Sequence, residues 1–155
     1  TTAYRDSDAS NPHEDIMTKF SLIAGLALAT LAAPAFAGDA AKGEADFKKC
    51  KACHAIIADD GTEIVKGGKT GPNLYGVIGR QIGSYPDFKY GDSTVAAGAD
   101  GTLWDEASLA AYVADPTAWL KTKTGDDAAK SKMSFKLAKG GEDMAAYLAS
   151  VKPAM

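Results

Sequence analysis

The sequence has too few cysteines for a disulfide framework, with two in 155 residues. Two thiols cannot hold a small fold together by several disulfides, and they cannot build a four-thiolate metal site. An excess of positive charge is also missing. The 17 Lys and Arg face 20 Asp and Glu, and the net charge of −3 argues against a nucleic-acid-binding protein. A content of 46% hydrophobic and 24% charged residues argues against intrinsic disorder.

No apolar run comfortably reaches the roughly 20 residues of a membrane-spanning helix. The most apolar stretch covers residues 20–31, after Lys19 and before Pro34 and an A-x-A sequence that ends at Ala37. A positive start, a short apolar centre and a small-residue end predict a secretory signal peptide over residues 17–37, cleaved after Ala37. A buried core helix and an uncleaved membrane anchor are the alternatives.

The polar residues 1–16 begin with Thr and precede a potential initiator, Met17. We interpret them as an upstream extension or misplaced start without a fold of its own. Residues 38–155 then form one domain of ordinary size, which the signal peptide would direct to the periplasm. This segment keeps both cysteines but a single histidine, His54, because His13 belongs to the extension.

The signals for secondary structure in residues 38–155 are helical. Caps, prolines and apolar periodicity predict helices over 40–51, from Asp105 to Asp115, from Pro116, and from Glu142 to the end. Residues 58–93 and 121–139 are rich in turn-forming residues and are predicted to be mostly irregular. No alternating strand pattern competes, so we predict an all-α fold. Loops of this length in a compact domain usually have a specific function, such as wrapping a ligand.

Both cysteines and the single histidine of the mature segment fall in one run, Cys50-Lys51-Ala52-Cys53-His54. C-x-x-C-H is the attachment signature of a c-type haem, with two thiols for thioether bonds and an adjacent histidine for the iron. A zinc site would need a fourth ligand, although residues 38–155 hold no other Cys or His. A thioredoxin-like pair would follow a strand, and a plain disulfide would leave His54 unexplained.

A haem that carries electrons needs a second axial ligand, and residues 38–155 contain three methionines. Met144 lies on the apolar stripe of the last predicted helix, and Met155 is the last residue. Met133 lies in an irregular stretch with no core pattern, so it is the predicted ligand. Ligation by His and Met fills the iron coordination and favours outer-sphere electron transfer. An open sixth position, as in a haem enzyme or a gas-binding cytochrome, is the alternative.

The segment resembles the class I c-type cytochromes, and within them the bacterial cytochrome c2 and c-550 group. The matching features are CKACH, TGPNLYGVIGR, KMSF and the pair Trp104 and Tyr112, in the family's order. The resemblance implies crossing N- and C-terminal helices, long loops around one covalent haem c, and an electron carrier that is not an enzyme. It also implies that Gly43 and Phe47 pack against Met144 and Tyr147.

The resemblance further implies roles at matching positions. Cys50 and Cys53 would be the thioether anchors, and His54 and Met133 the axial ligands. The carbonyl of Pro72 would accept a hydrogen bond from His54. Arg80, Tyr90 and Trp104 would surround the haem propionates. Tyr112 would lie beside the sulfur of Met133. Without the resemblance, Arg80, Trp104 and Tyr112 could equally be ordinary core or surface residues.

Positive charge gathers around Met133, because residues 119–140 contain six lysines and two aspartates. A charge run is often only a solvated face. Here it predicts a docking rim that includes Lys121, Lys123, Lys130, Lys132 and Lys136 and that steers the protein to acidic partners. The resemblance implies the cytochrome bc1 complex as electron donor, a photosynthetic reaction centre or terminal oxidase as acceptor, and roles in photosynthesis and respiration. We expect a monomer.

Overall fold

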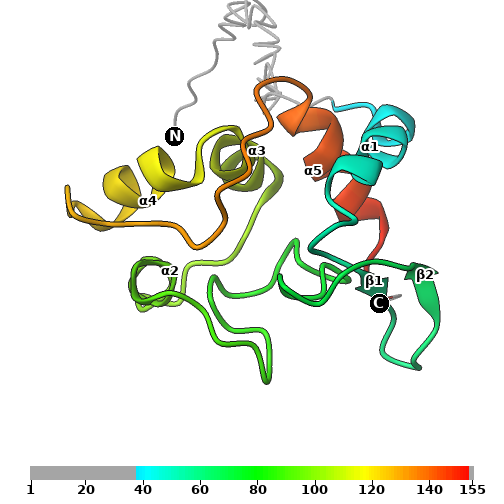
Figure 1. The fold of residues 1–155 in the computed structure, drawn as a ribbon, viewed down its shortest axis with the longest axis horizontal. Coiled ribbons are helices and arrows are strands. Elements are labelled where there is room, and N and C mark those ends of the chain that lie inside the picture. Colours follow the sequence, from blue (N-terminus) through cyan, green and yellow to red (C-terminus); the bar gives the residue numbers. More distant parts are fainter. Residues whose placement is uncertain (1–37, 154–155) are drawn as a thin grey trace, which may run out of the picture. The chain divides into compact units, whose positions relative to one another are not determined.

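The computed structural model describes residues 38–153 (Figure 1). The predicted extension (1–16), the signal peptide (17–37) and Met155 lie outside the described residues. Within 38–153 no helix is long and apolar enough to cross a membrane. The elements are, in order, α1 (Ala40–Asp46), the 3-10 helix η1 (Phe47–Lys49), β1 (Ile56–Ile57), β2 (Glu63–Val65), α2 (Asp92–Ala97), α3 (Glu106–Ala114), α4 (Pro116–Thr124) and α5 (Gly141–Ser150).

The first helix begins where its cap predicts and ends earlier than predicted. The Asp39 carboxylate accepts hydrogen bonds from the backbone N–H groups of Ala41 and Lys42, at 3.0 and 3.2 Å. The α-helix stops at Asp46 and tightens into η1, a common way for a helix to end. The predicted helix over residues 40–51 therefore continues beyond Asp46 only as a 3-10 helix and is wrong beyond Lys49, and residues 50–53 of the C-x-x-C-H run lie in turns.

The boundaries of α3 and α4 follow from their capping residues. Asp105 accepts a hydrogen bond from the backbone of Ser108, and the Ser108 hydroxyl accepts one from the Asp105 N–H, which completes a capping box. Asp115 ends α3, and its carboxylate caps α4 through the N–H of Ala118 at 3.1 Å. Pro116 is the first residue of α4. These predicted boundaries are confirmed.

The helices at the two ends of the described chain cross and pack together (Figure 1). A Cβ on Gly43 would lie 2.0 Å from the Asp143 carbonyl oxygen, so only glycine allows α1 to approach α5 this closely. The rings of Phe47 and Tyr147 meet edge to face, with centroids 5.6 Å apart. Met144 is only 1% exposed in the same core. The predicted helix contact and the structural role of Met144 are confirmed.

A short β-hairpin and a short helix fall in or at the edge of the segment predicted to be irregular. Strands β1 and β2 form an antiparallel hairpin, and α2 follows with six residues. The hairpin turns at Asp60 and Gly61, where the Asp60 carboxylate accepts from the Thr62 N–H at 2.9 Å and Gly61 has φ of +87°. Both elements are too short to show a recognisable apolar period. Helix α4 also runs four residues, 121–124, into the segment predicted to be irregular.

Candidate haem-binding site

The C-x-x-C-H run forms a compact turn directly after η1. The Cys50 carbonyl accepts hydrogen bonds from the N–H groups of Cys53 and His54, at 3.1 and 2.9 Å. Cys50 is half-buried against the hydrophobic core, whereas Cys53 is exposed, and neither thiol is in a disulfide. Burial raises the pKa of the Cys50 thiol to about 11. The turn thus presents two thiols and one imidazole from a single stretch of chain.

The imidazole of His54 is oriented by a carbonyl distant in sequence. Its Nδ1 lies 2.8 Å from the carbonyl oxygen of Pro72. A carbonyl can only accept, so Nδ1 carries the hydrogen and Nε2 keeps a free lone pair. Burial lowers the pKa of His54, and the bond to Pro72 opposes this effect. The ring is therefore held in the neutral tautomer that a metal ligand requires.

A glycine-rich loop, residues 67–71, packs its backbone against this turn. The N–H groups of Gly68 and Gly71 donate to the carbonyls of Lys51 and Cys53, both at 2.8 Å. A Cβ on Gly71 would lie 2.3 Å from Cε1 and 2.6 Å from Nδ1 of His54. The sequence indicated only turns at these glycines. The structure shows that the missing side chain of Gly71 leaves the space that the His54 ring occupies, whereas Gly67 and Gly68 lie against the backbone carbonyls of His54 and Ala52.

Met133 lies in the loop between α4 and α5, half-buried at the edge of the core. The Ser131 hydroxyl accepts from the backbone N–H of Met133 at 3.0 Å and lies 3.2 Å from the Tyr112 hydroxyl on α3. The amino group of Lys132 donates to the carbonyls of Lys89 and Tyr90, at 3.1 and 3.3 Å. The Met133 loop is therefore tied to α3 and to the Tyr90 segment.

Three aromatic rings, each in contact with the other two, line the same part of the fold. The centroid of Trp104 lies 5.1 Å from those of Tyr112 and Trp119, and the latter two are 5.6 Å apart. Trp104 is buried, and Tyr112 and Trp119 pack against the core. The helix predicted from Pro116 includes Trp119, but no sequence pattern indicated that its ring packs against Trp104 and Tyr112.

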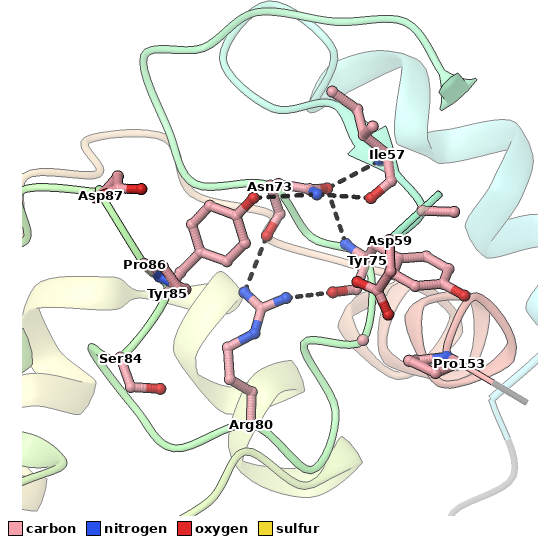
Figure 2. A pocket seen from close by; sticks show the side chains of 12 residues that line it. Ile57, Asp59, Asn73, Tyr75, Arg80, Ser84, Tyr85, Pro86, Asp87 and Pro153 are labelled. Carbon is pink, nitrogen blue, oxygen red and sulfur yellow. Dashed lines mark hydrogen bonds between the residues drawn. The ribbon is translucent and has the colours of Figure 1, made fainter. Parts of the chain in front are cut away.

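The guanidinium of Arg80 is half-buried and held by backbone carbonyls. It donates to the carbonyl of Asn73 at 2.9 Å and to that of Tyr75, and it lies over the Tyr85 ring, 4.7 Å from the centroid. Burial lowers the pKa of Arg80, and the adjacent Tyr90 and Tyr85 hydroxyls counteract this. Burial also raises the pKa of Tyr90. Arg80 borders a cavity of about 540 Å³ that Asn73, Tyr85 and Pro153 also line (Figure 2).

The described residues fit a covalent haem. The two thiols are available for thioether bonds, the Nε2 lone pair of His54 is free, and the thioether of Met133 lies at the edge of the core. Imidazole and thioether are the axial ligands of electron-transfer cytochromes. The backbone of Gly71 lies against the His54 ring, and the rings of Trp104 and Tyr112 pack together beside the loop of Met133, to which Ser131 joins Tyr112.

Comparison with known proteins decides the family. A cytochrome c2 from Rhodobacter capsulatus is 68% identical over 134 residues, which cover 86% of this chain and 98% of the relative. The chain belongs to the cytochrome c2 group of the class I c-type cytochromes. A cytochrome c-550 from Paracoccus versutus is 58% identical over 139 residues, or 87% of this chain and 90% of the relative. No protein-family model matches the chain.

Solved structures agree with this assignment. The cytochrome c2 structure from Rhodobacter capsulatus superimposes with a TM-score of 0.73 at 69% identity, covering 74% of this chain and 98% of that one. Ferric cytochrome c-550 from Paracoccus versutus also gives 0.73, at 58% identity, covering 76% of this chain and 100% of that one. The predicted fold class is therefore confirmed. This cytochrome carries one covalent haem c, transfers electrons to and from redox partners, and is not an enzyme.

Proposed function

We propose that Cys50 and Cys53 anchor the haem by thioether bonds, and that His54 and Met133 bind its iron from opposite sides. The observation that carries this assignment is the 2.8 Å bond from His54 Nδ1 to Pro72, which leaves Nε2 as the free ligand atom. Met133 is favoured over Met144 because Met144 is 1% exposed and packed within the helix core. When bound, the haem supplies an iron centre that gains or loses one electron.

The residues around these ligands have supporting roles in the proposal. Pro72 orients His54 and increases its basicity by accepting the Nδ1 hydrogen. Tyr112 lies beside the Met133 segment through Ser131. Arg80, Tyr90 and Trp104 surround the propionates, where one cation and neutral donors can satisfy carboxylates. Arg80 and Tyr90 are both half-buried, and they lie close enough to influence each other's pKa.

The cytochrome is proposed to work in the periplasm, after removal of residues 17–37 and of any upstream extension. Electrospray mass measurement of the protein exported by a bacterial host with c-type haem maturation tests this. The expected mass is that of residues 38–155 with one haem attached. Replacing Cys50 and Cys53 by alanine should remove the haem from the mass completely. A mature chain that retains residues 1–16, or a haem lost from the wild-type protein in acid acetone, would contradict the proposal.

The Lys-rich rim (Lys121, Lys123, Lys130, Lys132 and Lys136) is proposed to dock this cytochrome to acidic faces of the bc1 complex and of a reaction centre or terminal oxidase. The structure divides the rim into two kinds of lysine. Lys123 pairs with Asp100 at 3.2 Å and Lys136 with Asp115 at 2.6 Å, so these charges are partly neutralised. Lys121 and Lys130 are exposed and have no ion pair within residues 38–153. They are the stronger candidates for steering.

Electron-transfer rates to such partners should fall as salt rises, because screening shortens to about 8 Å near 0.15 M ionic strength. Lys130→Glu should lower the second-order rate at low salt several-fold, with little effect at high salt. Lys42→Glu, on the exposed face of α1 and eight residues before Cys50, changes the net charge equally and serves as the control. The measurement is stopped-flow or flash kinetics with each partner over a salt series. Equal effects of the two variants, or rates independent of salt, would eliminate the docking role.

A further inference from the structure

Two stretches of chain, residues 53–57 and 71–75, lie side by side and hold the His54 ring in place. Gly71 donates its N–H to the Cys53 carbonyl at 2.8 Å, and Leu74 donates to the Ala55 carbonyl at 3.1 Å. The bond from His54 Nδ1 to Pro72 lies between these two links in sequence. The position of the Pro72 carbonyl therefore depends on how firmly the two stretches are joined.

The side-chain amide of Asn73 forms the last link between the two stretches (Figure 2). Its Oδ1 accepts from the N–H of Ile57 at 3.0 Å, and its Nδ2 donates to the carbonyl of Ile57 at 2.7 Å. Oδ1 also accepts from the Tyr75 N–H at 3.1 Å, and Nδ2 also donates to the Tyr85 hydroxyl at 3.4 Å. The amide thus uses both donors and both acceptor positions, as a half-buried amide at a fixed orientation can.

We propose that Asn73 is a positioning residue for His54: by pairing with the backbone of Ile57, its amide fixes the adjacent Pro72 carbonyl as the acceptor for Nδ1. The inference rests on the proposed role of His54 as iron ligand. The Pro72 carbonyl and the Asn73 N–H share one peptide plane, so a backbone rotation that turned this carbonyl away from His54 would also displace the Asn73 side chain and break its bonds to Ile57. Outer hydrogen-bond partners of this kind orient a metal-bound histidine and tune its basicity.

The hydrogen-bond partners of Asn73 define a graded series of variants in the haem-loaded protein. Asn73→Ala removes all four hydrogen bonds, Asn73→Asp keeps the two that Oδ1 accepts, and Tyr85→Phe removes only the 3.4 Å bond. Leu109→Ala, in the core face of α3, lowers stability without removing any hydrogen bond of either stretch and serves as the stability control. The first readout is hydrogen exchange of the His54 Nδ1–H, measured by nuclear magnetic resonance in the reduced protein. The second is the reduction potential.

We expect the Nδ1–H to exchange at least tenfold faster in Asn73→Ala than in the wild type, because the pairing with Ile57 beside Pro72 is lost. A tenfold change corresponds to about 1.4 kcal/mol, the size of one to two net hydrogen bonds. Asn73→Asp should lie between Asn73→Ala and the wild type, and Tyr85→Phe should resemble the wild type. The potential should become more positive in Asn73→Ala than in Tyr85→Phe, since a weaker bond to Pro72 makes His54 a poorer electron donor. Asn73→Asp is compared by exchange alone, because its added negative charge would itself stabilise the oxidised iron. If Asn73→Ala does not assemble with haem, the exchange rates of the Nδ1–H in Asn73→Asp and Tyr85→Phe test the proposal. The rate should be higher in Asn73→Asp.

Two results would overturn the role of Asn73. One is that Leu109→Ala accelerates Nδ1–H exchange as much as an Asn73 variant of equal stability. The other is unchanged exchange in both Asn73 variants and an unchanged potential in Asn73→Ala. A failure of the proposed function has a different signature, because it would appear in the wild type. Ligation by His54 is checked independently of Asn73 in the variant His54→Gly. This variant should lose the low-spin absorption and regain it when imidazole is added.

Discussion

Replacing Met133 by alanine should abolish the weak absorption band of sulfur-to-iron bonding and open the sixth coordination position. The reduced variant should then bind carbon monoxide rapidly, whereas the reduced wild type should not. The reduction potential should fall by a few tenths of a volt, because a thioether ligand favours the reduced iron and water does not. Optical spectra, carbon monoxide binding and potentiometry measure these three effects.

The matched control for this experiment is the methionine in the helix core. Met144→Leu conserves volume at a position that is 1% exposed, so it should cost less than about 1.5 kcal/mol of stability and leave the sulfur band intact. Fast carbon monoxide binding to the wild type would instead favour the alternative of an open site, as in a haem enzyme or gas-binding cytochrome. Loss of the sulfur band in Met144→Leu but not in Met133→Ala would exchange the assignment of the two residues.

The second large effect is expected from one added methyl group at Gly71. A Cβ there would lie 2.3 to 2.8 Å from three atoms of the His54 ring, well inside van der Waals contact. Either the ring or the glycine-rich loop must move, and overpacking of this kind costs about 1–3 kcal/mol. Gly71→Ala should therefore lower the free energy of unfolding by that amount and weaken the bond from Nδ1 to Pro72. Chemical denaturation and the exchange rate of the Nδ1–H measure both consequences.

Thr70 supplies the control for Gly71 because it is the preceding residue and is exposed. Thr70→Ala should change stability by less than about 0.5 kcal/mol, as expected for a surface position. If Gly71→Ala is as stable as the wild type and keeps its Nδ1–H protected, the close contact between residue 71 and the ring does not constrain the site.

Local signals predicted the helix boundaries well where a single side chain decides them. Helices begin after Asp39 and Asp105 and at Pro116 as predicted. The carboxylates of Asp39, Asp105 and Asp115 cap them, because a carboxylate at an N-cap satisfies backbone donors that the helix itself leaves unpaired. The early end of α1 at Asp46 was not predictable in the same way. Residues 47–51 have no breaker, and their path is decided by hydrogen bonds to the Phe47 and Cys50 carbonyls in the folded turn.

The candidate ligands were also visible in the sequence, because covalent attachment requires two thiols and a histidine within five positions. Their supports were not. Asn73 reaches Ile57 across 16 residues of sequence, Ser131 reaches Tyr112 across 19, and Lys132 reaches Tyr90 across 42. Such contacts join residues that have no periodic relation to one another, so only the path of the loops brings them together.

The sequence by itself determined the class of this protein: one C-x-x-C-H run, a single histidine in residues 38–155 and helices marked by their caps. Those properties depend on residue types at short spacing, which a linear pattern records. The tertiary structure decided which atom of His54 is free, which residues orient its ring, and which lysines keep their charge unpaired. These properties depend on distances between remote residues, because hydrogen bonds, burial and ion pairing act over a few ångströms of space.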